Sequence, residues 1–191
     1  QELVKIESYS GQEQKLAQFI MLWAKKYGLP AETQDGNVVI KFLVNSPKAV
    51  IFNAHMDTVK PGNLDFWSTP PTGSSAGAIK DNKLYGRGAL DCKGGVAISI
   101  YTLKILSDMG KLDAAKFVGV ADEESGADSK LGLMYLLEKG LRAKEAIYTY
   151  GEDEKYSSLT IGHRGLIRLW VRCLGESVHS GTKEWQDREK G

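Results

Sequence analysis

Residues 49–57, AVIFNAHMD, decide the fold: a short β-rich apolar run ends in a histidine and an acidic residue. A run of this kind is typical of a strand buried on both faces. Residues two apart in extended chain point the same way, so His55 and Asp57 face one side. That arrangement suits a metal-binding imidazole and a carboxylate that orients it. Taken alone, the pair is better explained by a buried histidine with satisfied hydrogen bonds.

The segments around this run alternate between helical and strand-like patterns. Apolar spacing predicts helices over residues 11–28, 94–109 and 129–139. β-rich runs predict strands over residues 38–44, 116–121 and 145–150, with a brief one at 84–85. Residues 61–78 are rich in Pro, Gly, Ser and Thr and predict a long surface loop. This alternation predicts an α/β fold with a mostly parallel sheet.

The pattern changes after Gly162. Residues 166–171 are apolar-rich but contain Arg168, and Arg172 follows, which suits a half-exposed antiparallel sheet. We therefore expect a first domain over residues 1–162 and the start of a second over residues 163–191.

Composition excludes several classes of partner. Lys and Arg total 25 against 24 Asp and Glu, a net charge of +1, which gives no reason to expect nucleic acid or an anionic membrane. No stretch approaches the roughly 18 apolar residues of a membrane span. The two cysteines, Cys92 and Cys173, are interpreted as structural and favour a reducing, cytoplasmic location. Both ends look cut, so a targeting signal could have been removed.

A second chemical signal is the glycine-rich run YGRGALDCKGG at residues 85–95, which contains Asp91. Small residues allow the backbone to approach a bound ligand closely. A phosphate cradle is the first alternative, but no Gly-Lys-Ser/Thr follows the turn and no G-x-G-x-x-G follows a buried strand. A simple helix cap is the second alternative, and it is the simpler interpretation of Asp91 taken alone.

Two acidic runs, ADEESG at residues 121–126 and GEDE at residues 151–154, each follow a predicted strand. Either run could be a solvated loop. However, His55, Asp91, the Glu123–Glu124 pair and Glu152 would all lie at the carboxyl edge of one sheet, where α/β proteins bind ligands. Mixed nitrogen and carboxylate ligands suit zinc, and a shared carboxylate suits a metal pair.

Together these motifs resemble the zinc-dependent aminoacylase family, which includes acetylornithine deacetylase, succinyl-diaminopimelate desuccinylase and bacterial glutamate carboxypeptidases. The resemblance runs from Leu3 to about Gly181 through HMDTV, LYGRGALDCKGG, ADEESG and GEDE, in that order. It implies a three-layer zinc-exopeptidase sandwich, followed by an α+β domain that acts as a dimerising lid.

The resemblance also implies a metal-ligand set. Asp91 would bridge two Zn²⁺ ions, for which Co²⁺ or Mn²⁺ could substitute. His55 and Glu152 would complete one site, and Glu124 would bind the second ion. The family's last histidine ligand lies beyond this chain, since such proteins are about twice as long, so the second site is incomplete here. Asp153 stands where the family often has Pro, and Asp153 or Glu154 are alternatives to Glu152.

The catalytic roles follow from the same resemblance. Glu123 would be the general base for a zinc-bridging water and would pass the proton to the leaving amine, while Asp57 would orient His55. His179 would reach the partner's site in a homodimer and stabilise the oxyanion, with an exposed loop histidine as the alternative. His163 is interpreted as a surface or structural residue.

We therefore expect a metal-dependent hydrolase that cleaves an amide or peptide bond of an N-acyl amino acid or a short peptide. The alternative is a non-catalytic, metal-stabilised interaction module. Glu123 favours the enzyme, because a purely structural zinc needs no spare base.

Overall fold

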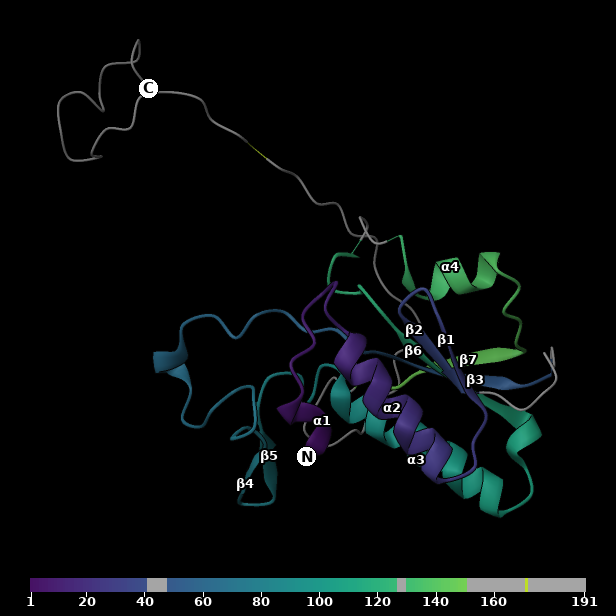
Figure 1. Cartoon of the computed structure of the whole chain (residues 1–191), viewed down its shortest axis with the longest axis horizontal. Coiled ribbons are helices and arrows are strands. Elements are labelled where there is room, and N and C mark those ends of the chain that lie inside the picture. Colours follow the sequence, from purple (N-terminus) through teal and green to yellow (C-terminus); the bar gives the residue numbers. More distant parts are fainter. Residues whose placement is uncertain (41–47, 127–129, 151–170, 172–191) are drawn as a thin grey trace, which may run out of the picture. The chain divides into compact units, whose positions relative to one another are not determined.

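The computed structural model describes residues 1–40, 48–126, 130–150 and residue 171 (Figure 1). Within these residues, the main sheet has five strands in the order β1-β2-β6-β3-β7. Their bounds are β1 Ala31–Gln34, β2 Asn37–Ile40, β3 Val50–His55, β6 Ala115–Val120 and β7 Glu145–Tyr148. The strand and the domain boundary expected beyond residue 150 lie outside the described residues, apart from Val171.

The strand pairs on the β7 side of the sheet are parallel, and those on the β1 side are antiparallel. β3 pairs in parallel with both β6 and β7, whereas β1 pairs antiparallel with β2, and β2 with β6. Asp35 and Gly36 join β1 to β2 with φ angles of 44° and 87°, the positive values that a two-residue hairpin of the right twist requires. β1 has the polar sequence AETQ, in which the sequence patterns predict no strand.

Helices cover both faces of the sheet, which confirms the expected three layers. α2 (Gln14–Lys26) and α3 (Lys93–Asp108) pack on the face that contains Val38, Ile40 and Phe117. α4 (Gly132–Glu138) packs on the opposite face, against Val39, Ile51, Val118 and Val120. The alternation of Val38, Val39 and Ile40 between the two cores is the two-residue period of a strand with both faces buried.

The remaining elements are short. The chain begins with α1 (Glu2–Lys5), and the loop after β3 contains the 3-10 turn η1 (Leu64–Phe66) and then the hairpin of β4 (Ala78–Lys80) and β5 (Lys83–Tyr85). A second 3-10 turn, η2 (Leu112–Ala114), precedes β6. Across the described ranges, none of the helices has both the length and the apolar character needed to cross a membrane.

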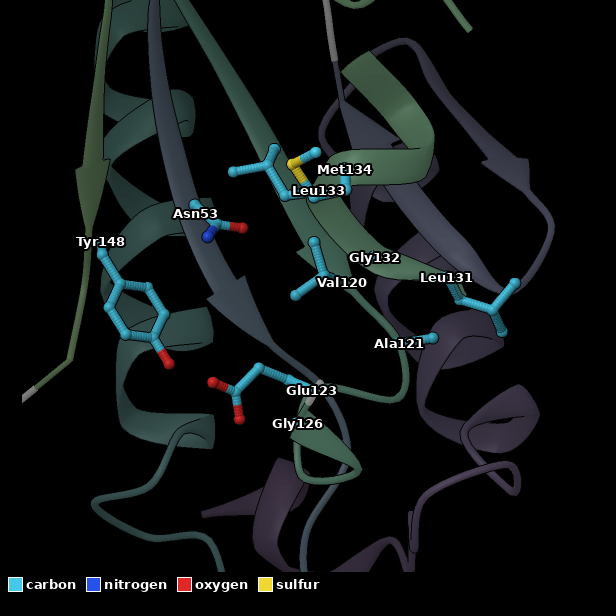
Figure 2. Close-up of a pocket in the computed structure, with 10 residues that line it drawn as sticks. All are labelled: Asn53, Val120, Ala121, Glu123, Gly126, Leu131, Gly132, Leu133, Met134 and Tyr148. Carbon is cyan, nitrogen blue, oxygen red and sulfur yellow. The ribbon is translucent and has the colours of Figure 1, made fainter. Parts of the chain in front are cut away.

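Three parallel strands end at one edge of the sheet. Figure 2 shows Asn53 on β3, Val120 on β6 and Tyr148 on β7 near this edge, with Glu123 beyond the end of β6. His55 is in register with Val120, and Asn53 with Tyr148. Side chains that follow β3 and β6 therefore meet at the edge where ligand sites of α/β sheets form.

Candidate metal centre

His55 is the last residue of β3, and its side chain is only 1% exposed. Its Nδ1 lies 2.9 Å from the backbone oxygen of Asp57, and because a carbonyl can only accept, Nδ1 carries a proton. Nε2 lies 2.6 Å from Asp91 Oδ1. Burial lowers the pKa of His55, but the carboxylates of Asp57, Asp91 and Glu123 outweigh it and raise the pKa to about 9. The surrounding carboxylates therefore favour a positive charge next to Nε2.

Asp91 is held by the glycine-rich turn before α3. Its side chain is 45% exposed, so it faces both His55 and solvent. The peptide bond from Asp91 to Cys92 is cis. A Cβ on Gly95 would overlap the carbonyl oxygen of Thr149, just past β7. Glycine at this position therefore lets α3 begin against the sheet edge, with Asp91 directed at His55.

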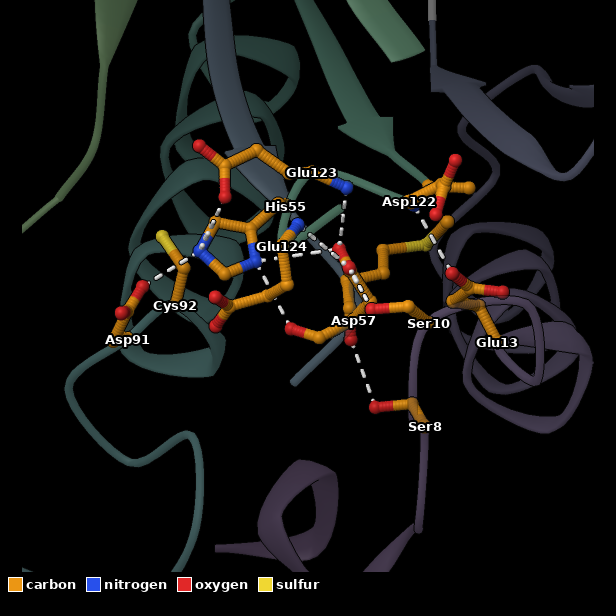
Figure 3. Close-up of polar contacts among 12 residues, drawn as sticks. Ser8, Ser10, Glu13, His55, Asp57, Asp91, Cys92, Asp122, Glu123 and Glu124 are labelled. Carbon is orange, nitrogen blue, oxygen red and sulfur yellow. Dashed lines mark hydrogen bonds and ion pairs between the residues drawn. The ribbon is translucent and has the colours of Figure 1, made fainter. Parts of the chain in front are cut away.

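Glu123 and Glu124 follow β6, and the Glu123 carboxylate lies on the Nε2 side of the histidine, as Asp91 does (Figure 3). Glu123 Oε2 lies 3.9 Å from His55 Nε2, and the Glu123 side chain is 47% exposed. Burial and the neighbouring carboxylate of Asp91 raise the pKa of Glu124, with smaller contributions from Glu123 and Asp57. This crowding of acids is unfavourable unless a cation shares them.

Asp57 is fully buried and lies behind this cluster. Its Oδ1 accepts from the backbone N–H of Glu123 at 3.1 Å, and its Oδ2 accepts from that of Glu124 at 2.9 Å and from Ser10 Oγ at 2.8 Å. Although burial raises the pKa of Asp57, the hydrogen bonds from His55, Glu124, Ser10 and Glu123 outweigh burial and lower it. Asp57 therefore remains a carboxylate and joins the β3 end to the β6 end.

The donor set fits a divalent metal ion. The ligand atoms of His55, Asp91 and Cys92 lie within 4.8 Å of one another, and Glu123 and Glu124 border the same space. One imidazole nitrogen with several carboxylate oxygens is a ligand set that zinc accepts. Cys92 fits less well, because burial raises its thiol pKa to about 12 and its Sγ donates to the Thr149 carbonyl at 3.5 Å. We therefore keep Cys92 out of the proposed ligand set.

The structure brings together the sequence-predicted residues His55, Asp57, Asp91, Glu123 and Glu124. Glu152, with its alternatives Asp153 and Glu154, lies outside the described residues, as do His163 and His179. Their roles stay predictions.

Sequence patterns did not indicate a further set of residues that lies behind the site. Ser10 and Glu13 hydrogen-bond to the segments that carry the acids, and Asn37 Oδ1 accepts from the backbone N–H of Ala121 at 2.9 Å. The available signal was the run SYSGQE at residues 8–13, which places two serine hydroxyls and an acid just before a helix.

A pocket of about 390 Å³ opens beside Glu123 on the face that α4 covers (Figure 2). Val120, Leu131, Leu133 and Met134 give it apolar walls, and Tyr148 stands opposite them. Asn53 also lines it, and its buried Oδ1 has no hydrogen-bond partner among the described residues. The pocket thus combines an apolar lining with one unused acceptor, next to the acidic cluster.

Comparison with known proteins agrees with this geometry. The model of peptidase family M20/M25/M40 matches residues 51–164, more than half of the chain. The chain belongs to this family. The matched range of the M20 chain contains all five residues that the structure brings together, and the family resemblance seen in the sequence is confirmed.

The M20 chain is similar to longer proteins. It is 29% identical to a LysW-lysine hydrolase of Deinococcus radiodurans over 98% of this chain and 49% of that protein. It is 33% identical to a succinyl-diaminopimelate desuccinylase of Roseobacter denitrificans over 70% of this chain and 36% of that protein. The chain thus spans about half the length, or less, of these curated relatives.

Solved structures show the same fold. The M20 family metallo-carboxypeptidase Sso-CP2 of Sulfolobus solfataricus matches with a TM-score of 0.65 and 25% identity, over 81% of this chain and 37% of that one. Human carnosine dipeptidase 1 matches with a TM-score of 0.53 and 26% identity, over 72% of this chain and 33% of that one. The α/β architecture of the M20 chain is therefore confirmed.

Proposed function

We propose that this chain carries most of the catalytic centre of a zinc-dependent hydrolase that cleaves an amide or peptide bond in an N-acyl amino acid or short peptide. The observation that carries the proposal is the convergence of His55, Asp91 and Glu123 at one sheet edge, with Nε2 of the histidine 2.6 Å from Asp91 and 3.9 Å from Glu123. Family membership supports hydrolysis, and relatives named as hydrolase, desuccinylase and carboxypeptidase support the substrate class.

The proposed ligands divide between two ions. Asp91 would bridge them, His55 and Glu152 would complete one site, and Glu124 would contribute to the other. The second site would need a further ligand besides Asp91 and Glu124. When bound, zinc would polarise the scissile carbonyl and lower the pKa of the attacking water.

Glu123 is the proposed general base. The backbone N–H groups of Glu123 and Glu124 both donate to Asp57, and the two side chains leave the backbone in different directions (Figure 3). One carboxylate can therefore hold metal while the other accepts a proton from water and delivers it to the leaving amine. Proton transfer of this kind contributes about 10²- to 10⁴-fold to a reaction rate.

Accessibility favours the enzyme over a structural metal module. Asp91 and Glu123 are nearly half exposed, whereas His55 and Asp57 are buried. Structural zinc sites are closed by their ligands, while catalytic sites keep an open position. The pocket that begins at Glu123 offers room for a substrate group next to that open side.

The proposal includes a partner contribution. His179, beyond the expected boundary at Gly162, would reach the site of a second copy in a homodimer and stabilise the oxyanion.

The test compares Glu123→Gln with Glu124→Gln in the complete natural protein, with Glu138→Gln, at an exposed residue of α4, as control. Glu123→Gln should retain zinc and lose about 10²- to 10⁴-fold in kcat. Glu124→Gln should lose both zinc and activity, while Glu138→Gln should keep both. The measurements are metal content and the rate of hydrolysis of an N-acyl amino acid and a dipeptide. Undiminished kcat in Glu123→Gln would contradict the assigned base.

A further inference from the structure

The N-terminal segment of residues 6–13, here the N-terminal brace, lies against both segments that carry the proposed metal ligands. Along the first one, Tyr9 forms a parallel bridge with Thr58, and the backbone N–H of Thr58 donates to the Ser8 carbonyl at 2.8 Å. The Ser8 hydroxyl donates to the carbonyl of Met56, also at 2.8 Å. The brace thus fixes residues 56–58, directly after His55.

The brace also holds the second segment, after β6. Glu13 is 4% exposed, and its Oε1 accepts from the backbone N–H of Asp122 at 3.0 Å and from that of Gly11 at 2.9 Å. Asp122 has a φ of 60°, a conformation that is uncommon for a residue other than glycine. Glu13 therefore fixes the backbone where the chain turns to place Glu123 and Glu124.

Ser10 acts at the junction of the two segments. Its hydroxyl donates to Asp57 Oδ2, the same oxygen that accepts from the backbone N–H of Glu124 (Figure 3). At the other end of the brace, the buried ammonium group of Lys93 donates to the Ile6 carbonyl at 2.5 Å. Lys93 begins α3, two residues after Asp91, so the brace is tied to all three ligand-bearing segments.

We propose that Ser10 and Glu13 are positioning residues that set the metal affinity of the site through Asp57 and the backbone of Asp122. This inference rests on the proposed metal centre. The physical reason is preorganisation: the acids repel one another, and a framework that holds them close before the metal arrives lowers the cost of binding it. Outer residues that orient metal ligands typically affect affinity or activity by about 10- to 100-fold.

The experiment compares truncating and conservative substitutions at both positions in the complete protein. Ser10→Ala and Glu13→Ala remove the hydrogen bonds, whereas Ser10→Thr keeps a hydroxyl and Glu13→Gln keeps an acceptor oxygen. Ser99→Ala is the matched control, since the buried Ser99 hydroxyl contacts Thr149 Oγ1 at 2.7 Å, away from Asp57 and Asp122. Zinc affinity is measured by competition with a chelator, and melting temperature is measured without metal.

The expected result is a rise of about 10- to 100-fold in the zinc Kd of both alanine variants, with the Kd of the conservative variants within about threefold of the unsubstituted protein. Ser99→Ala should lower the melting temperature without changing the Kd. If the alanine variants lower the melting temperature but leave the Kd unchanged, as in Ser99→Ala, the brace serves stability alone and the proposal is overturned.

A second readout needs no bound metal and remains usable if one alanine variant is poorly stable. The nitrogen resonances of the His55 ring in metal-free protein report the protonation and hydrogen bonding of each ring nitrogen. Because Ser10 acts through Asp57, the ring resonances should shift in Ser10→Ala and return in Ser10→Thr. Ring resonances that are identical in all variants would also overturn the proposal.

Discussion

Asp57 Oδ2 accepts a hydrogen bond from the backbone N–H of Glu124 at 2.9 Å. This contact joins the end of β3 to the turn after β6, and the backbone N–H of Met56 reinforces it by donating to the Val120 carbonyl at 2.8 Å. The sequence predicts that Asp57 orients His55. In the structure, the hydrogen-bond partner of His55 Nδ1 is the backbone oxygen of Asp57, and the Asp57 carboxylate fixes the segment that carries the proposed base and a proposed ligand.

Replacing Asp57 with asparagine should weaken metal binding. Both carboxylate oxygens accept from backbone N–H groups, so the side-chain amide of the Asp57→Asn variant would face one of them with a donor. We expect zinc affinity to fall by about 10- to 100-fold and the free energy of unfolding to fall by about 1–3 kcal/mol. Chelator competition and urea denaturation measure the two effects. Asp81→Asn, in an exposed turn, is the control and should change neither quantity. Unchanged affinity in Asp57→Asn would contradict this role.

The ligand after β7 can be assigned by separate substitutions in the run GEDE. β7 runs parallel to β3, so the chain leaves it at the edge where His55 lies. Glu152→Ala should reduce the zinc content of purified protein, whereas Asp153→Ala and Glu154→Ala should leave it unchanged. Metal analysis after gel filtration checks this. Loss of zinc in Asp153→Ala or Glu154→Ala, and not in Glu152→Ala, would assign the ligand to that residue instead of Glu152.

Adding a Cβ at Gly95 should destabilise the fold even though the residue is in a helix. Helix propensity alone would favour alanine by about 1 kcal/mol. The added atom, however, would overlap the Thr149 carbonyl oxygen, a backbone group that cannot rotate away. We expect Gly95→Ala to lower the free energy of unfolding by about 1–3 kcal/mol or more, measured by chemical denaturation. Equal or greater stability would show that α3 and Thr149 can move apart at little cost.

Two asparagine-to-leucine substitutions should have opposite effects on stability. Within the described part of the chain, the buried Asn53 Oδ1 has no partner, so Asn53→Leu should raise the free energy of unfolding by about 1 kcal/mol. Asn37 accepts from Ala121 and donates to the Gln34 carbonyl, so Asn37→Leu should lower it by about 1–3 kcal/mol. If the pocket beside Glu123 binds substrate, Asn53→Leu should also raise KM. Destabilisation by Asn53→Leu would mean that its amide makes a needed contact.

Metal removal should lower stability because the crowded acids lose the charge that they share. Zinc at about 100 times its Kd should add about 2.7 kcal/mol to the free energy of unfolding relative to chelated protein. Asp91→Ala should abolish most of this difference, since Asp91 faces His55 at the centre of the site. Thermal denaturation with and without a chelator gives the comparison. Stabilisation that persists in Asp91→Ala would place the bound zinc elsewhere.

The sequence by itself determined the elements with strong periodic signals and the residues that follow them. The helix around Leu16 and Ile20 and the strands that precede Asp57 and Asp122 are predicted within a few residues, because apolar periodicity reports burial directly. His55, Asp91, Glu123 and Glu124 could be found because each follows a predicted strand or lies in a glycine-rich turn before a helix. The strand β1 is not predicted, since its polar sequence AETQ forms a strand only by pairing with β2.

Tertiary structure alone decided how the site is held. Ser10 and Glu13 lie 47 and 109 residues from their partners Asp57 and Asp122, and no local pattern records contacts over such distances. The requirement for glycine at position 95 likewise depends on Thr149, the residue after β7, which approaches Gly95 only when α3 packs on the sheet. Periodicity encodes which residues are buried and which acids follow strands, but the partner of each hydrogen bond is fixed only when distant segments pack together.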